Sequence, residues 1–384
     1  MRFEFATATR VVFGPGTWRE VAPLASELGQ RALIVTGRST GRAQPLLEAL
    51  HGAGVGHSLF SIAGEPTTVD VETGVEVARR EGCDFVIALG GGSAMDGAKA
   101  IAAMLANPGE LLDYLEVVGR GKPVSRPSAP WMAIPTTAGT GAEVTRNAVL
   151  ASLPHQVKAS LRSPLMLPRL ALVDPELTHR LPPAITASTG LDALTQLIEP
   201  YVCLRANPLT DALCVEGMKR AARSLRRAFD NGADAAARED MSAASLFSGM
   251  TLANAGLGAV HGFAAPIGGS FPAPHGAVCA ALLPHVMAVN LRALGQRSPG
   301  SEALRRYDEV ARVLTGRSQA TAPDGVAWVQ DLCVALQVPG LRTHGITPGD
   351  FATLCEKAAA ASSMKANPIG LAPEELREIL ERAV

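Results

Sequence analysis

The chain of 384 residues lacks several features that would place it in particular classes of protein. Its six cysteines form no Cys-x-x-Cys pair, and its charges form no acidic or basic block at a formal net charge of −1. The scattered cysteines argue against a disulfide framework or a cysteine metal site, and favour free buried thiols in a cytoplasmic protein. The absence of a basic block argues against a nucleic-acid partner.

Long apolar runs are lacking too. The opening MRFEFATATRVVFG has no apolar stretch long enough for a signal peptide. No run of about twenty apolar residues free of charge, proline or glycine is present, so we expect no membrane partner. What the sequence does have is 47% hydrophobic against 18% charged residues, which is typical of a well-buried globular protein of one or two domains.

In the first half, apolar β-branched runs alternate with helical patterns. This alternation predicts a parallel sheet flanked by helices. Strands are expected over 31–37, 83–93, 129–141 and 170–177, with helices over 19–28 and 71–82. The opening residues 2–14 predict one or two further strands, and 148–161 predicts a β-hairpin that turns at Pro154.

After about residue 180 the pattern becomes helical, with little strand character. Helices are expected over 186–202, 208–228, 235–257, 275–292, 301–315, 325–336, 348–362 and 372–383. We therefore predict an α/β domain over 1–180 and an all-α domain over 181–384.

The segment LGGGSAMDGAKA (89–100) runs from a strand through three glycines into a helix. Glycines at Gly91 and Gly92 would let a pyrophosphate approach the backbone, and the helix that starts near Ser93 would offer free N–H groups. A tight turn without a ligand is the alternative, but a turn alone does not need three glycines. The usual dinucleotide fingerprint follows the first strand, and this segment is not in that place.

A second polar turn, PTTAGTGAE (135–143), follows another predicted strand. Thr136, Thr137 and Thr140 offer hydroxyl groups there. By itself the turn is a weak signal, because polar loops are common. Two such loops at the ends of strands of one sheet predict a shared ligand crevice.

The loop VTGRST (35–40) bears on the choice of cofactor. An acidic residue after this strand would hold the adenosine ribose hydroxyl of NAD. The chain has Gly37, Arg38 and Ser39 instead, which are suited to a 2′-phosphate. The loop therefore favours NADP over NAD, although it could also be an ordinary polar loop.

The helix GLDALTQLIEPYV (190–202) carries Asp192 and Gln196 one turn apart on an otherwise apolar face. A buried carboxylate needs a compensating partner. The segment VHGFAAPIGGSFPAPHG (260–276) holds His261 and His275, which could complete a mixed nitrogen and oxygen site for Fe²⁺ or Zn²⁺. Structural histidines are the alternative, and spacing alone does not decide between them.

Six segments together resemble the iron-containing (group III) alcohol dehydrogenase family, nearly from end to end. They are VVFGPG, GGGSAMDGAKA, PTTAGTGAEVT, LVDPELT, GLDALTQLIEPYV and VHGFAAPIGGSFPAPHG. The resemblance implies the fold shared with dehydroquinate synthase, in which 1–180 is the dinucleotide-binding α/β domain and 181–384 is the helical domain for metal and substrate. It implies that a divalent metal and the nicotinamide meet in a cleft between the two domains. It also implies NAD(P) as cofactor, an alcohol, aldehyde or ketone as substrate, and a homodimer, for which the opening strands could pair across two copies.

Carried over residue by residue, the resemblance implies three groups of site residues. The metal ligands are Asp192, Gln196, His261 and His275, and the catalytic group is His261, His275 and Lys158. The cofactor-binding positions are Gly91, Gly92, Ser93, Asp96, Lys99, Thr136, Thr137, Thr140, Lys158 and Leu177. The loop chemistry described above adds Gly37, Arg38 and Ser39 to the cofactor-binding residues.

Two positions depart from the family pattern. Gln196 stands where GMDALTH-like sequences have a ligand histidine, and a neutral amide oxygen is a weaker ligand than imidazole for Fe²⁺ or Zn²⁺. Ala265 stands where HGMAHPLG-like sequences have a histidine linked to proton relay.

The function implied is hydride transfer between NAD(P)H and an alcohol/carbonyl pair, with the metal as a Lewis acid. Three alternatives stay open. A metal-independent enzyme similar to maleylacetate reductase would fit the loss of a ligand, although those enzymes typically lose the acidic ligand that Asp192 keeps. A lyase similar to dehydroquinate synthase needs a cationic pocket, and 250–280 has no Lys or Arg. The last alternative is a nucleotide-binding relative without catalysis.

Overall fold

The computed structural model describes residues 2–155 and 157–384, so Gln156 of the predicted hairpin lies outside the described residues. The chain divides into two compact units, and each is described by itself. The α/β unit comprises Ala6–Thr137 and Gly141–Thr178. The helical unit comprises the described residues up to Phe5, the short segment Ala138–Thr140, and His179–Val384.

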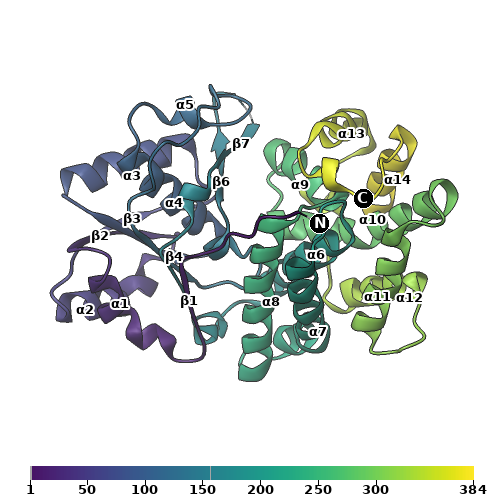
Figure 1. Cartoon of the computed structure of the whole chain (residues 1–384), viewed down its shortest axis with the longest axis horizontal. Coiled ribbons are helices and arrows are strands. Elements are labelled where there is room, and N and C mark those ends of the chain that lie inside the picture. Colours follow the sequence, from purple (N-terminus) through teal and green to yellow (C-terminus); the bar gives the residue numbers. More distant parts are fainter. Residues whose placement is uncertain (1, 156) are drawn as a thin grey trace. The chain divides into compact units, whose positions relative to one another are not determined.

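The α/β unit is built on a parallel sheet (Figure 1). Within the described residues its strand order is β1-β8-β5-β4-β2-β3, and every pair of neighbours is parallel. The strands are β1 (Arg10–Phe13), β2 (Arg31–Thr36), β3 (Gly56–Ser61), β4 (Phe85–Gly90), β5 (Trp131–Pro135) and β8 (Leu170–Val173). This sheet confirms the predicted α/β class.

Helices cover both faces of this sheet, because its central strands are apolar on both sides. Along β2, Ala32 and Ile34 face a core with α1 and α2, while Leu33 and Val35 face a core with α3 and α4. The helices are α1 (Val21–Ser26), α2 (Gln44–Gly52), α3 (Thr68–Arg80), α4 (Gly92–Ala106) and α5 (Leu111–Tyr114).

The expected hairpin is present as β6 (Asn147–Ser152) paired antiparallel with β7 (Val157–Arg162). The sequence prediction missed β3, α2 and the short α5. Strand β3 lies at one edge of the sheet and alternates half-buried and exposed residues, so its sequence GHSLFS lacks the continuous apolar run of the central strands.

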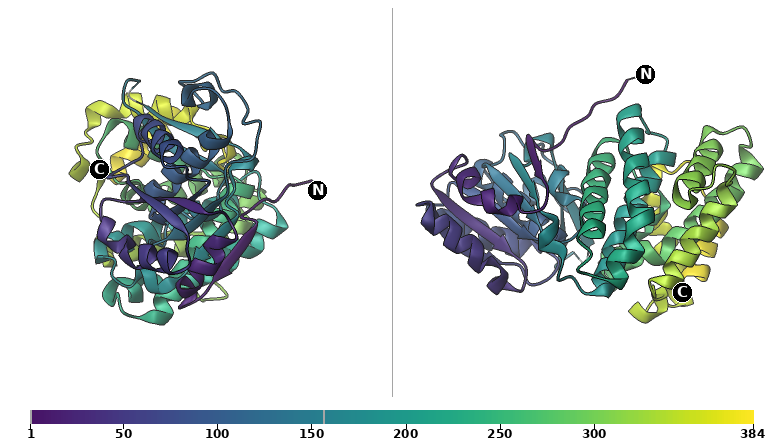
Figure 2. Two further views of the ribbon diagram at one scale, coloured as in Figure 1. Left: turned by 90° about the vertical axis from the view of Figure 1, so that its left-hand side faces the viewer. Right: turned by 90° about the horizontal axis from the view of Figure 1, so that it is seen from below.

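The helical unit consists of packed helices (Figure 2). They are α6 (Pro183–Val202), α7 (Pro208–Asp230), α8 (Ala235–Asn254), α9 (Ala259–Ser270), α10 (His275–Arg297), α11 (Glu302–Thr315), α12 (Ala322–Ala335), α13 (Phe351–Ala360) and α14 (Pro373–Ala383). Helix α9 was not among the predicted helices, because its glycines and Pro266 mask the periodicity. The predicted all-α character of this part of the chain is confirmed.

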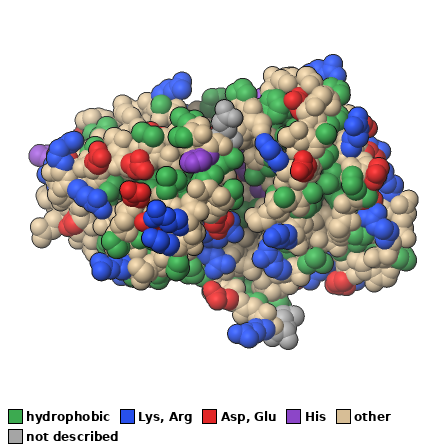
Figure 3. Space-filling model, turned by 90° about the horizontal axis from the view of Figure 1, so that it is seen from above, with side chains coloured by type: hydrophobic (Ala, Val, Ile, Leu, Met, Phe, Trp, Pro, Cys, Tyr) green, Lys and Arg blue, Asp and Glu red, His purple; other side chains and the backbone are tan. Residues whose placement is uncertain are grey.

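Helix α10 is the one helix in the described ranges that is long and apolar enough to cross a membrane by itself, with a mean hydropathy of 1.6. Of that apolar window, 72% is buried inside the structure, which is the pattern of a core helix. On the face drawn in Figure 3, Lys and Arg side chains are interspersed with Asp and Glu side chains.

Candidate active site

Helix α6 carries a buried carboxylate in the core of the helical unit. Asp192 is 1% exposed and follows Leu191, which is fully buried. Among the described residues, Asp192 Oδ1 has no hydrogen-bond partner. A carboxylate oxygen in such a place is costly unless a positive charge faces it.

Two imidazoles from other helices approach that oxygen. His261 Nε2 on α9 lies 3.5 Å from Asp192 Oδ1, and His275 Nε2 at the start of α10 lies 3.6 Å from it. The His261 side chain is buried, whereas that of His275 is 38% exposed. The structure thus brings together three of the four predicted metal ligands, and their role as ligands stays a prediction.

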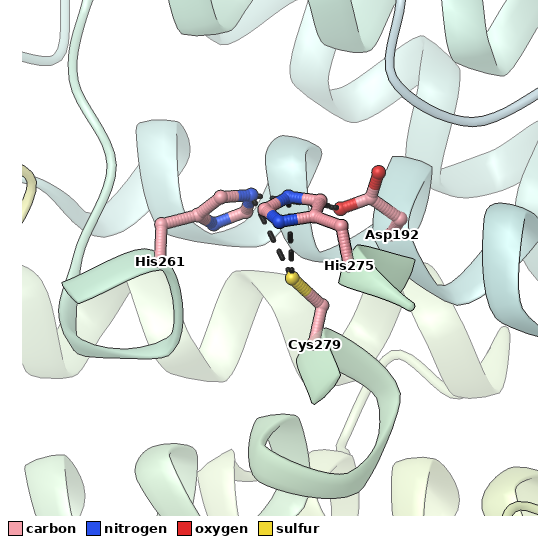
Figure 4. Close-up of side chains that lie close together, drawn as sticks. All are labelled: Asp192, His261, His275 and Cys279. Atoms are coloured by element: carbon pink, nitrogen blue, oxygen red, sulfur yellow. Dashed lines mark hydrogen bonds and ion pairs between the residues drawn. The ribbon is translucent and has the colours of Figure 1, made fainter. Parts of the chain in front are cut away.

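A cysteine joins these three residues. Cys279 is fully buried one turn after His275 on α10, and its Sγ lies 3.9 Å from His261 Nε2 and 3.7 Å from His275 Nε2. The donor atoms of Asp192, His261, His275 and Cys279 all lie within 4.8 Å of one another (Figure 4). We call these four residues the metal-site cluster. The absence of a Cys-x-x-Cys pair had argued against a cysteine metal site, but this cysteine is one member of a cluster whose other members come from separate segments of the chain.

Glu199 fixes the orientation of His261. Its Oε2 accepts a hydrogen bond from His261 Nδ1 at 2.6 Å, and its Oε1 accepts one from the Val260 backbone N–H at 2.7 Å. Because a carboxylate accepts only, Nδ1 carries the proton and Nε2 faces the cluster with its lone pair when His261 is neutral. Sequence reasoning did not single out Glu199. Its signal was a third polar residue on the face of α6 that carries Asp192 and Gln196.

The charges in the cluster stabilise one another. Burial by itself would raise the pKa of Asp192, but His275 and His261 lower it below its ordinary value. Burial would lower the pKa of His261, yet Cys279, Glu199 and Asp192 raise it well above its usual range. Cys279 raises the pKa of His275 to about 9, with help from Asp192 and against the effect of burial. A cation bound here would replace the imidazole protons.

Gln196 is buried one turn after Asp192 and has a structural contact. Its Nε2 donates a hydrogen bond to the Gly139 carbonyl at 3.2 Å, and Ser248 Oγ donates to the same oxygen at 3.3 Å. The amide therefore helps to hold the segment Ala138–Thr140, which also contains the predicted cofactor residue Thr140. Of the Gln196 side chain, only the amide oxygen remains as an atom that could coordinate a cation.

The predicted phosphate loops lie at one edge of the sheet in the α/β unit. Strands β2, β4 and β5 are parallel neighbours, so the loops after them meet at their carboxyl ends. A Cβ built on Gly91 would lie 3.2 Å from Thr137 Oγ1, and the Thr136 N–H donates to the Gly90 carbonyl at 2.9 Å. Strand order reverses between β2 and β4, which is the position where open α/β sheets bind ligands.

Helix α4 begins in the glycine run, with Gly91 as its N-cap residue and Gly92 and Ser93 in its first turn. Glycine has no side chain to cap the helix, so the first N–H groups are available to an anion. Gly91 and Gly92 also leave the backbone open to close approach by a ligand.

Lys99 and Asp96 of α4 support the surrounding backbone. Lys99 is fully buried, and its Nζ donates to Thr145 Oγ1 at 2.8 Å and to the Asn147 carbonyl at 2.7 Å. Burial lowers the pKa of Lys99 to about 8. Asp96 Oδ2 accepts from the Val149 N–H at 3.1 Å.

The remaining predicted residues of this unit differ in exposure. Gly37 is half-buried, whereas Arg38 and Ser39 are exposed in the loop after β2. Lys158 on β7 forms an ion pair with Glu65, with Nζ and Oε1 2.6 Å apart. Leu177 packs against the core that contains α1 and α2.

Comparison with known proteins places the chain among alcohol-oxidising enzymes. Residues 8–175 match the family described as iron-containing alcohol dehydrogenase, and residues 186–384 match the C-terminal part described for the same family. The chain belongs to the iron-containing alcohol dehydrogenase family, as its motifs had indicated.

Individual relatives agree over nearly the whole chain. A 1,3-propanediol dehydrogenase of Klebsiella pneumoniae is 34% identical, over 99% of this chain and 98% of its own length. An NAD-dependent methanol dehydrogenase of Bacillus methanolicus is 33% identical, over 97% of each. A crystal structure of a 1,3-propanediol oxidoreductase covers 100% of both chains, with a TM-score of 0.93 and 33% identity.

Proposed function

We propose that this protein catalyses reversible hydride transfer between NAD(P)H and a small alcohol/carbonyl pair, assisted by a divalent metal at the metal-site cluster. The observation that carries the proposal is the buried, unpartnered Asp192 Oδ1 with two imidazole nitrogens beside it. One carboxylate and two imidazoles are a donor set that suits Fe²⁺ or Zn²⁺.

When bound, such a cation supplies Lewis-acid polarisation of the substrate oxygen. The chain's own residues prepare this site. Glu199 holds His261 in the tautomer whose Nε2 points into the cluster. The half-exposed His275 leaves one side open to solvent, which gives a small substrate access.

The nucleotide is proposed to bind at the carboxyl edge of the sheet. The N–H groups at the start of α4 would bind the pyrophosphate. Thr136 and Thr137 add hydroxyl groups beside the glycines, and the nicotinamide supplies or receives the hydride. Lys99 acts through the backbone that its ammonium group holds, since its Nζ is buried among protein acceptors.

We propose NADP as the preferred cofactor because Arg38 is exposed in the loop where an NAD-specific site has an acidic residue. A charge-assisted hydrogen bond contributes about 1.5–3 kcal/mol. We expect Arg38→Ala to raise the KM for NADPH by about 10–100-fold and to leave that for NADH nearly unchanged.

The matched control is Arg80→Ala. Arg80 is the last residue of α3 and lies just before β4, so it is near the amino ends of the strands and away from the proposed nucleotide site. Steady-state kinetics with both cofactors checks this prediction. Equal effects of Arg38→Ala on NADPH and NADH would contradict it.

The proposed substrates are small alcohols, aldehydes or ketones, because the relatives named above are a methanol and a 1,3-propanediol dehydrogenase. The experiment is to strip the protein with a chelator, reload it anaerobically with Fe²⁺ or Zn²⁺, and follow NAD(P)H oxidation over a panel of aldehydes and ketones. We expect activity in proportion to the bound metal. Activity that persists without metal would instead support a metal-independent reductase of the maleylacetate type, which the engaged amide of Gln196 and the missing histidine at Ala265 favour.

A further inference from the structure

We propose that Cys279 Sγ is a ligand of the metal and replaces Gln196 as the fourth protein donor, with Asp192, His261 and His275. This inference rests on the proposed function, in that it assumes that the cluster binds a divalent cation. Cys279 is not among the ligands that the family resemblance implies. Its sulfur would replace a neutral amide oxygen in the set of metal ligands.

The separations between donor atoms support this assignment. A tetrahedral ion with bonds of about 2.0–2.3 Å to nitrogen, oxygen and sulfur has donor atoms about 3.3–3.8 Å apart. In the structure, Cys279 Sγ lies 3.7 and 3.9 Å from the two imidazole nitrogens. Those nitrogens lie 3.5 and 3.6 Å from Asp192 Oδ1. Four of the six separations are therefore close to those of one tetrahedral site, and the other two are within 4.8 Å.

The position of Cys279 in the fold points the same way. It follows His275 by one turn of α10, so both side chains lie on one face of that helix, as Figure 4 shows. The thiol is fully buried, and its contacts in the cluster are the two imidazoles that also face Asp192. A buried cysteine without such neighbours would be an ordinary apolar core residue.

Gln196 is the weaker candidate for the same place. Its amide nitrogen is engaged with the Gly139 carbonyl, and its oxygen is neutral. A thiolate and a carboxylate together balance the two charges of the cation, whereas an amide and a carboxylate leave one charge unbalanced. When the metal binds, the Cys279 thiol loses its proton to solvent and the sulfur–metal bond forms.

The thiolate should also change which metal the site prefers. Sulfur ligands favour Zn²⁺, while oxygen-rich sites suit harder cations. We therefore expect the site to retain Zn²⁺ in competition with an excess of Mn²⁺ or Mg²⁺, and the Cys279→Ser variant to lose much of this preference.

The test is the spectrum of the full chain after metal removal and loading with Co²⁺. We expect a thiolate-to-cobalt charge-transfer band in the near ultraviolet for the parent protein and for Gln196→Ala, and its loss in Cys279→Ser. Replacing a residue that only orients a ligand costs about 10–100-fold in metal affinity, so loss of a ligand should cost at least as much. The control is Cys355→Ser, a half-buried cysteine on α13.

The outcomes separate this inference from the proposed function. If equilibrium dialysis shows bound Co²⁺ but the band is absent, or if the band persists in Cys279→Ser, the cysteine is not a ligand and the proposed function stands. If the parent protein binds no metal, both are overturned. If Cys279→Ser does not fold, zinc-edge X-ray absorption of the parent protein decides, because a sulfur neighbour at about 2.3 Å is required.

Discussion

At the scale of single residues, the metal-site cluster depends on Glu199, which orients His261. Its two oxygens accept from two different donors, His261 Nδ1 and the Val260 N–H. An amide has only one accepting oxygen, so Glu199→Gln would place an N–H₂ group against one of these donors. His261 would then lose its fixed orientation or tautomer.

We therefore expect Glu199→Gln to weaken Zn²⁺ binding by about 10–100-fold, as measured by competition with a chromophoric chelator. Glu356→Gln, at an exposed position of α13, is the control and should leave affinity unchanged. Parent-like affinity in a folded Glu199→Gln protein would show that the carboxylate does not position His261.

The roles of individual side chains in the site were harder to predict from the sequence than the fold was. The pattern of Asp192, His261 and His275 was recognisable because each lies in a family motif. Glu199 lies 62 positions from its imidazole partner, and an acid in a helix usually indicates a solvated surface. Cys279 was hard to predict for a related reason: the other members of the cluster come from three helices, and only His275 is near Cys279 in the sequence.

At the scale of elements, the start of α9 is the tightest part of the site. Gly258, the residue before α9, has Asn367 Oδ1 and Glu199 Oε1 beside it, and a Cβ there would lie 2.8 and 2.9 Å from these two atoms. The same Asn367 oxygen accepts from the Ala259 N–H at 3.1 Å. Glycine is thus required for the helix end to approach the carboxylate that holds His261.

Gly258→Ala should destabilise the protein by about 1–3 kcal/mol, because the close contacts force the two polar groups to move. It should also weaken metal binding, since Glu199 is one of those groups. The matched variant is Gly295→Ala in α10, where nothing lies within 4 Å of the added methyl group. There alanine should stabilise by about 0.5–1 kcal/mol. Thermal unfolding of both variants checks the pair, and a Gly258→Ala protein as stable as the parent would contradict the argument.

Helices and strands with a clear apolar pattern were predicted well. Those whose apolar pattern is interrupted by exposed residues, glycine or proline were missed. The buried strands β2, β4, β5 and β8 are continuous apolar runs, and the helices after residue 180 mostly carry apolar stripes. Strand β3 is half exposed, and α9 has internal glycines and a proline. Tertiary packing, which local sequence does not encode, decides the structure of such segments.

At the scale of the whole molecule, the fold class followed from the order of the elements. Strand–helix alternation favours a parallel sheet, and in a parallel sheet the loops after neighbouring strands lie at the carboxyl ends of those strands, on one edge. The position of the metal-site cluster in the helical unit could not be predicted from the order of the elements. It needs α6, α9 and α10 at one point, and only the family motifs, not periodicity, indicated that they meet.

Metal-assisted hydride transfer is the activity proposed for this protein. Its most direct test uses a reduced nicotinamide cofactor deuterated at the transferable ring position, a short-chain aldehyde such as propanal, and the full chain loaded with Zn²⁺ or Fe²⁺. We predict an alcohol product with deuterium on its carbinol carbon, formed at a rate that rises with bound metal and falls to background after chelation. No transfer across a panel of aldehydes and ketones by the metal-loaded protein, or undiminished transfer by protein shown to be free of metal, would contradict the account.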